Sequence, residues 1–258
     1  PISQPRGTEW EAVDKNIEDV TEIYSMHGAS EYYGNPRQLI SVTKGQSVRD
    51  ALKLGLKLGF IGGGDDHLTH PGSGYPVEKS MMFPFIVCLK YRPGIAAIIS
   101  DSLDIKSLFA ALKKRHCYAT TGEKIYLDFR IGKAIMGDEI KVSGSPVLKV
   151  TACGTGRLQQ VDIVKNGEIA HCFHCTEDRA KFAYKDEELK RGQKAYYYAR
   201  VLQRDGEMAW SSPIWVKRLT EDEEDLALAE ERLKNGEFIS QSAMNKYAAK
   251  RGLKLHKR

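Results

Sequence analysis

The stretch Ile95-Ala96-Ala97-Ile98-Ile99, with the segments that follow it, decides the fold that the sequence predicts. Such a short apolar run is typical of a buried strand. Residues 104–116 then carry apolar side chains at helical spacing, and residues 117–122 return to a strand pattern that ends at a glycine. Strands separated by helical segments at this spacing are typical of parallel βα units.

The same order of patterns occurs earlier in the chain. Residues 20–25 form a β-prone run, residues 48–58 have helical spacing, and Phe60-Ile61 leads into three glycines. Residues 1–122 are therefore predicted to be an α/β region.

The pattern changes after Gly122. Residues 124–217 consist of short alternating runs, such as residues 126–131, with no convincing helix between them. Asn166-Gly167 and Asp205-Gly206 supply the hairpin turns that connect such strands. We expect residues 123–218 to form a small β-sandwich.

The composition changes again from Thr220 onwards. Thr220 and Glu223 have the spacing of a helix capping box, and an acidic stretch rich in Ala and Leu follows them. Residues 246–258 are basic, and a solvated terminal helix explains them more simply than contact with RNA or an anionic surface. Residues 219–258 are thus predicted to be a charged helical tail.

The overall composition is that of a globular protein. The 258 residues are 41% apolar and 28% charged, and the net charge of +5 is too small to imply a nucleic-acid partner. Apolar runs fall far short of the roughly 18 residues of a membrane-spanning helix, so no membrane partner is expected. Five cysteines, an odd number, fit reduced thiols better than a disulfide framework. None of these features assigns a cellular compartment.

The polar loop after residues 60–61 carries the first candidate site. Asp65 and His67 are two residues apart, so in extended geometry their side chains project to the same side. A carboxylate and an imidazole together suit Zn, Mn or Fe, which makes these residues the predicted metal ligands. The alternative is a surface turn in which Asp66 caps a helix and the histidines are solvated.

Three groups capable of proton transfer gather near the end of the first predicted strand. Glu22 lies within an apolar β run, where an ionised carboxylate is costly unless it is paired or bound to metal. His27 and Glu31 follow in the adjoining loop, so all three are candidate catalytic residues. The alternative is an edge strand with Glu22 facing water and Ser30 capping the next turn.

Two further pairs have both a functional and a structural interpretation. Thr120 and Thr121 are candidates for binding a substrate phosphate through hydroxyl and backbone N–H groups, or they simply link a strand to the sandwich. Cys172 and Cys175 have the C-x-x-C spacing of a zinc site, but in a strand they point to opposite faces.

Four segments together resemble the PHP (polymerase and histidinol phosphatase) superfamily. They are residues 21–31, 59–67, 115–122 and 205–215, and their order is similar to that of an uncharacterised family within the superfamily. The resemblance covers about residues 5 to 218 and leaves the tail outside it.

The resemblance implies that residues 1–122 are the C-terminal part of a distorted seven-stranded βα barrel, a TIM-like fold. It implies a metal-dependent hydrolase, a phosphoesterase, in which Asp65 and His67 hold divalent Zn, Mn or Fe. A metal-bound hydroxide would attack the phosphorus of a small-molecule phosphoester. Glu22, His27 and Glu31 would line that site.

The chain also departs from the superfamily pattern. The first motifs, which include an H-x-H pair, belong upstream of Ile2, and Gly63-Gly64 replaces the usual Gly-Ser before Asp65. We therefore expect an upstream segment or a partner chain to complete the barrel, and little or no hydrolysis by this chain alone. The alternative is a non-catalytic scaffold for binding or interaction, which would have no use for tightly held divalent ions.

Overall fold

The computed structural model describes residues 8–14, 16–39, 43–65, 91–235 and 240–250. The chain divides into two compact units, Pro1–Arg218 and Leu219–Arg258. In the described residues the first unit is mainly β structure and the second is helical.

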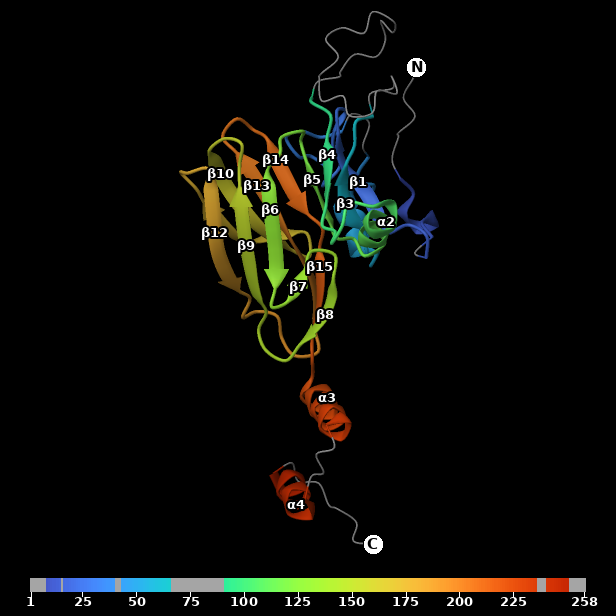
Figure 1. The fold of residues 1–258 in the computed structure, drawn as a ribbon, viewed down its shortest axis with the longest axis vertical. Helices are drawn as coiled ribbons and strands as arrows, with labels where there is room; N and C mark the ends of the chain where they lie inside the picture. Colours follow the sequence, from blue (N-terminus) through green and yellow to red (C-terminus); the bar gives the residue numbers. More distant parts are fainter. Residues whose placement is uncertain (1–7, 15, 40–42, 66–90, 236–239, 251–258) are drawn as a thin grey trace, which may run out of the picture. The chain divides into compact units, whose positions relative to one another are not determined.

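The largest sheet of the first unit has eight strands (Figure 1). Six of them follow the order β11-β10-β13-β14-β5-β4, while β15 pairs with β13 and β8 pairs with β15. Their bounds are β4 Ile95–Ile98, β5 Cys117–Thr120, β8 Glu139–Val142, β10 Leu158–Lys165, β11 Glu168–His174, β13 Lys194–Gln203, β14 Met208–Ser211 and β15 Ile214–Arg218. Neighbouring strands are antiparallel except β15 with β8.

A second sheet packs on the first and makes a β-sandwich. Its order is β12-β9-β6-β7, and all its pairs are antiparallel. The strands are β6 Tyr126–Ile131, β7 Ala134–Ile135, β9 Val147–Cys153 and β12 Arg179–Lys185. Because successive side chains of a strand point to opposite faces, Phe129, Val150 and Val201 are among the residues that form one buried apolar cluster of this sandwich.

A small third sheet has the order β2-β1-β3, with β1 Val20–Ser25, β2 Gly28–Ala29 and β3 Gly59–Gly62. β1 and β3 run parallel, and the chain between them includes α1 (Val48–Lys53), whose N-terminus has a capping box. A single 3-10 turn, Trp10–Ala12, precedes β1. Ile23 and Phe60 share a second buried cluster with Tyr198 and Trp210 of the eight-stranded sheet, so this sheet and the sandwich have a common core.

The prediction of a partial (β/α)7 barrel is wrong. β4 and β5 lie on either side of helix α2 (Ile105–Lys113) in the sequence, yet they pair antiparallel with each other. β5 then pairs with β14, so this region extends a sheet of the sandwich. Of the predicted parallel βα units, only β1, α1 and β3 have the expected strand direction.

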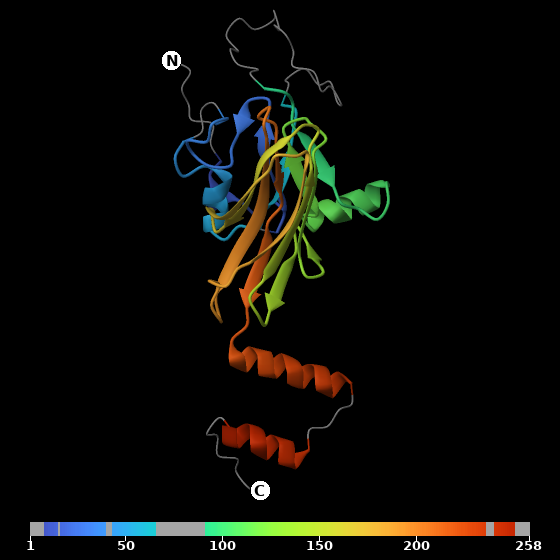
Figure 2. The same ribbon diagram turned by 90° about the vertical axis from the view of Figure 1, so that its left-hand side faces the viewer.

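The physical reason lies in the connection through α2. A barrel helix covers the outside of the strands, so its apolar face is buried. In this chain α2 projects away from the sheets (Figure 2), and the side chains of Ile105 and Phe109 are 88% and 63% exposed. The segment that contains α2 therefore connects two neighbouring antiparallel strands, β4 and β5, and is not the crossover connection of a parallel βα unit.

The second unit contains two helices, α3 (Glu221–Lys234) and α4 (Gln241–Lys250). The predicted capping box is confirmed, because the Glu223 N–H donates to Thr220 Oγ1 at 3.3 Å and the Thr220 N–H donates to Glu223 Oε2 at 3.1 Å. The Tyr247 hydroxyl of α4 donates to the Asp225 carboxylate of α3. Among the residues that the structure describes, no helix combines the length and apolar character needed to span a membrane.

Candidate functional site

The parallel pairing of β1 and β3 brings two predicted site segments together. Parallel strands end at the same edge of a sheet, so the residues after Ser25 and after Gly62 leave side by side. Two backbone hydrogen bonds continue beyond the strands: Gly63 N–H to the Tyr24 carbonyl at 3.0 Å and Met26 N–H to the Gly64 carbonyl at 3.4 Å. The two loops are thereby held against each other.

His27 and Asp65 meet at this edge. His27 Nε2 lies 3.4 Å from Asp65 Oδ2 and 3.1 Å from the Asp65 carbonyl oxygen. Asp65 has a φ of 51°, in the left-handed region that residues other than glycine rarely adopt. With this backbone conformation, the carbonyl oxygen and the carboxylate Oδ2 of Asp65 both lie close to the His27 imidazole.

Glu22 lies beside this pair. Although the residue is exposed as a whole, its carboxylate packs so closely on Gly63 that a Cβ there would lie 1.9 Å from Glu22 Oε2. Burial of the carboxyl group and the negative charge of Asp65 raise the pKa of Glu22 from 4.5 to about 7, against the opposing effect of a hydrogen bond with Ser25. Glu22 also lines a pocket of about 220 Å³ with Trp10, Tyr24 and other residues.

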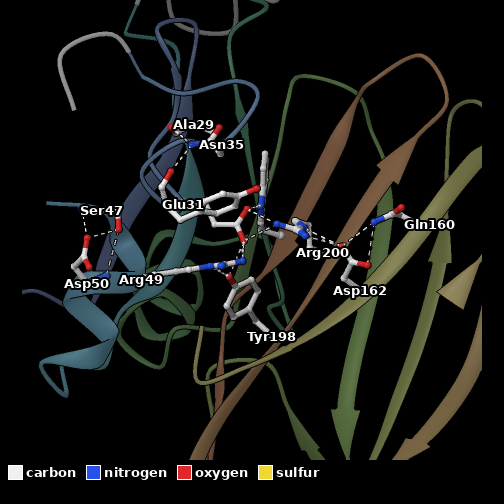
Figure 3. Close-up of polar contacts among 12 residues, drawn as sticks. Ala29, Glu31, Asn35, Ser47, Arg49, Asp50, Gln160, Asp162, Tyr198 and Arg200 are labelled. Atoms are coloured by element: carbon white, nitrogen blue, oxygen red, sulfur yellow. Dashed lines mark hydrogen bonds and ion pairs between the residues drawn. The ribbon is translucent and has the colours of Figure 1, made fainter. Parts of the chain in front are cut away.

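Glu31 belongs to a different place, a buried network between the small sheet and the sandwich (Figure 3). It accepts hydrogen bonds from Arg49 Nη2 at 2.9 Å, Tyr198 Oη at 2.6 Å, Arg200 Nη1 at 3.1 Å and Trp210 Nε1 at 2.8 Å. Burial alone would raise the pKa of Glu31, but Arg200 and Arg49, with the hydrogen bonds from Tyr198 and Trp210, hold it below 4.5.

The network continues into the sandwich through Arg200. Arg200 Nη2 lies 2.7 Å from Asp162 Oδ2, and Gln160 Nε2 donates to Asp162 Oδ1 at 3.1 Å. The guanidinium carbon atoms of Arg49 and Arg200 lie 4.3 Å and 5.9 Å from the ring centre of Tyr32. With every charged group paired, the arrangement has the character of a structural ion network.

Sequence reasoning did not identify Arg49, Asp162, Tyr198 or Arg200. A signal was present, because Asp162 and Arg200 both fall inside strand patterns that are otherwise apolar or aromatic. An ionisable residue in such a run requires a partner of opposite charge. The sequence did not indicate which residue supplies it.

The other predicted site residues lie elsewhere. Thr120 and Thr121 are buried at the end of β5, where the Thr121 hydroxyl donates to the Glu207 carboxylate and accepts from the Met208 N–H at 2.8 Å. The Thr120 hydroxyl accepts from the Gly122 N–H at 3.3 Å. His67 lies outside the described residues, so its relation to Asp65 stays a prediction.

Within the described part of the chain, no three His, Cys, Asp or Glu side chains form a group that could hold a metal ion. This holds for the C-x-x-C segment as well, where Cys172 Sγ lies 3.8 Å from His174 Nε2 while Cys175 is buried. From the predicted site, the structure pairs His27 with Asp65 and places Glu22 close enough to Asp65 for their charges to interact.

Comparison with known proteins does not assign the chain to a named family. No family model matches the chain. Uncharacterised proteins of Chlamydia muridarum (strain MoPn / Nigg), Chlamydia trachomatis serovar D and Chlamydia pneumoniae are 31%, 34% and 34% identical over 237, 223 and 236 residues. These matches cover 83%, 78% and 83% of this chain but 37%, 34% and 37% of the relatives, so the chain spans about a third of their length.

Similarity to solved structures is slight. Fibronectin(III)-like modules of Clostridium thermocellum CbhA match 34% of this chain and 94% of their own, with 14% identity and a TM-score of 0.25. An engineered protein matches 35% of this chain and 20% of its own, with 12% identity and a TM-score of 0.23. No conclusion about function follows from these matches.

The predicted membership of the PHP superfamily is wrong. No family model supports it, and the relatives are uncharacterised. The described part of residues 1–122, where half a barrel was expected, forms a small three-stranded sheet and two strands that extend a sheet of the sandwich. The PHP domain, the TIM-like barrel and the hydrolase classification implied by the resemblance lose their basis with it. The site residues have to be judged by their geometry.

Proposed function

We propose that the Glu22, His27 and Asp65 group is a proton-transfer site that acts on a polar small molecule bound at the end of β1. The observation that carries this proposal is the His27–Asp65 pair, with the Asp65 charge acting on Glu22, next to a pocket of about 220 Å³ that Glu22 lines. A pKa near 7 at Glu22 supports it, because a group that exchanges protons efficiently has a pKa close to the working pH.

His27 and Asp65 support the same role. A carboxylate next to an imidazole orients the ring, as a proton-transfer pair requires. His27 and Asp65 lie in the loops that follow the parallel strands, where polar side chains are free to face a ligand, and Glu22 lies within β1. Glu31 is excluded from this role, since Arg49 and Arg200 already occupy its carboxylate.

Two predictions from the sequence remain attached to this site as proposals. Divalent Zn, Mn or Fe on Asp65 and His67 is one, and a small-molecule phosphoester as substrate is the other. Neither follows from the geometry of the described residues. The test therefore varies the metal ion and uses a phosphoester as the substrate.

The test is a rate assay on a chromogenic phosphate monoester, with Zn, Mn, Fe or no added metal, for the wild type and Glu22→Gln. Losing a general acid or base costs roughly 100-fold or more in rate. Glu18→Gln is the matched control, because Glu18 is an exposed glutamate just before β1. A loss confined to Glu22→Gln supports the proposal, and an equal loss in both variants contradicts it.

A binding scaffold is the second candidate function. The buried network around Glu31 favours it, since this network joins the small sheet rigidly to the sandwich without offering a free group for chemistry. Under this reading, no metal ion and no substrate in the assay gives turnover, and Glu22→Gln has no phenotype beyond the pH dependence of stability.

A further inference from the structure

A second pocket lies apart from the Glu22 site. Its volume is about 610 Å³, against about 220 Å³ for the pocket that Glu22 lines. It lies between α1 and strands β8, β13 and β15, and it shares no lining residue with the pocket at Glu22. Pockets of about 300 to 1,000 Å³ are of the size that binds small-molecule ligands.

The rim of this pocket is positively charged. Five lysines line it, with Glu139 as the acidic residue among the lining side chains. Glu139 is already paired with Lys57 and, at 3.2 Å, with Arg115. Lys53, Lys141 and Lys194 are exposed, and among the described residues no ion pair involves them. The rim therefore attracts an anion.

Tyr196 supplies a hydroxyl group that is unpaired within the described part of the chain. Its side chain is 8% exposed, and the hydroxyl has no hydrogen-bond partner among the described residues. A Cβ placed on Gly167 would lie 3.4 Å from this hydroxyl and 3.5 Å from Lys53 Cε, so both groups border the same spot. Burial raises the pKa of Tyr196 to about 12, so the hydroxyl keeps its proton at neutral pH and acts as a donor.

The wall of the pocket is apolar and partly aromatic. Leu52, Ile140, Ala195 and Val216 contribute aliphatic surface, and Trp215 contributes an indole ring. The Arg115 guanidinium carbon lies 5.1 Å from the centre of that ring. A ligand with a flat ring system would bury its ring on this wall and direct its charged group to the lysines.

We infer that this pocket binds a phosphorylated small molecule with an aromatic ring, of the size of a mononucleotide. The phosphate would lie by Lys53 and the Tyr196 hydroxyl, which donate to its oxygens, while Lys194 contributes charge at the rim. This inference does not depend on the proposed proton-transfer site, because the two sites have no residue in common.

Isothermal titration calorimetry with AMP, adenosine and inorganic phosphate tests the inference. AMP should bind more tightly than adenosine or phosphate alone, because its ring contacts the apolar wall while its phosphate contacts the lysines of the rim. The double variant Lys53→Gln/Lys194→Gln should weaken AMP binding roughly tenfold. The control is Lys149→Gln/Lys181→Gln, which removes two exposed lysines from the other sheet and should leave the affinity unchanged.

Tyr196→Phe separates a ligand contact from a structural role. Because the hydroxyl has no partner among the residues that the structure describes, its removal should leave the melting temperature unchanged or slightly higher. AMP affinity should nevertheless fall several-fold. Absence of AMP binding, equal affinity for adenosine and AMP, or unchanged AMP affinity in both pocket variants would each overturn the inference.

Discussion

Glu22 on β1 and Glu31 just after β2 are the same type of residue on one short segment, and their pKa values shift in opposite directions. The Glu22 pKa rises from 4.5 to about 7, whereas the Glu31 pKa falls below 4.5. Glu31 is the more deeply buried of the two, at 2% exposure. Burial by itself therefore predicts the wrong order.

The difference lies in what surrounds each carboxylate. Glu31 receives hydrogen bonds from four side chains, two of which are arginines. Glu22 has the negatively charged Asp65 as its neighbour and a single hydrogen bond, with Ser25, that lowers its pKa. A buried carboxylate surrounded by cations and donors is a structural element, whereas one facing a second carboxylate is poised to take up a proton.

Arg200→Met should produce the largest loss of stability. It removes the cation that pairs with both Glu31 and Asp162, leaving two buried carboxylates short of charge. Breaking a buried ion pair in this way costs about 3 to 5 kcal/mol. The free energy of unfolding from urea denaturation measures the loss.

Arg130→Met is the matched control for Arg200→Met. Arg130 pairs with Asp128 at 2.8 Å, but its side chain is 45% exposed. Pairs of this kind contribute at most about 1 kcal/mol. Equal losses in the two variants would contradict the distinction between the buried network and the protein surface.

Tyr198→Phe should have the next largest effect on stability. Its hydroxyl donates to Glu31 at 2.6 Å and accepts from Arg49 Nε at 2.9 Å, so the variant deprives two charged groups of a partner. The expected loss is about 2 kcal/mol. Tyr196→Phe, two residues away on the same strand, removes a hydroxyl without a partner among the described residues and should cost nothing. The free energies of unfolding of Tyr198→Phe and Tyr196→Phe, from chemical denaturation, measure this difference in stability.

Glu22→Gln should change how stability depends on pH. The folded-state pKa of Glu22, about 7, lies above its ordinary value of 4.5, so between these values the folded protein binds more protons than the unfolded chain. Stability must therefore fall as the pH rises from 4.5 to 7 and level off above 7. The variant should lack this fall.

The measurement for Glu22 is the melting temperature of the wild type minus that of Glu22→Gln, recorded across this pH range. Glu18→Gln serves as the reference for removing a solvated carboxylate before β1. A difference that does not vary with pH would mean that the Glu22 carboxyl group is solvated, and the proposed proton-transfer site would lose its support.

Local patterns in the sequence predicted individual elements well. The strands over residues 20–25 and 126–131 have the predicted bounds, because alternation and β-prone residues act within a few positions. Strand direction was not predictable in the same way. β4 and β5 pair antiparallel, and β5 pairs in turn with β14, whose residues come about ninety positions later in the chain.

The candidate site was predictable only where two loops leave adjacent parallel strands. His27 and Asp65 met for that reason, and Glu22, within β1, lies against Gly63 of the second loop. Glu31 was grouped with them by nearness in sequence, yet Tyr198, Arg200 and Trp210, at separations of 167, 169 and 179 residues, hold it in the buried network. Pairing partners at such distances leave no mark on the local pattern.

Gly63→Ala is the smallest change and addresses the cause of the Glu22 shift. The new Cβ would lie 1.9 Å from Glu22 Oε2, so the carboxylate must move, and because Glu22 is an exposed, flexible residue it has room to do so. Displacing it into water should return its pKa toward 4.5, at a stability cost of at most about 1 kcal/mol. Gly144→Ala is the control, since a Cβ there meets nothing within 4 Å.

Titration of the Glu22 carboxyl carbon by NMR gives the pKa directly. If it stays near 7 in Gly63→Ala, packing against Gly63 is not what desolvates the carboxylate, and other neighbours of Glu22 must bury it.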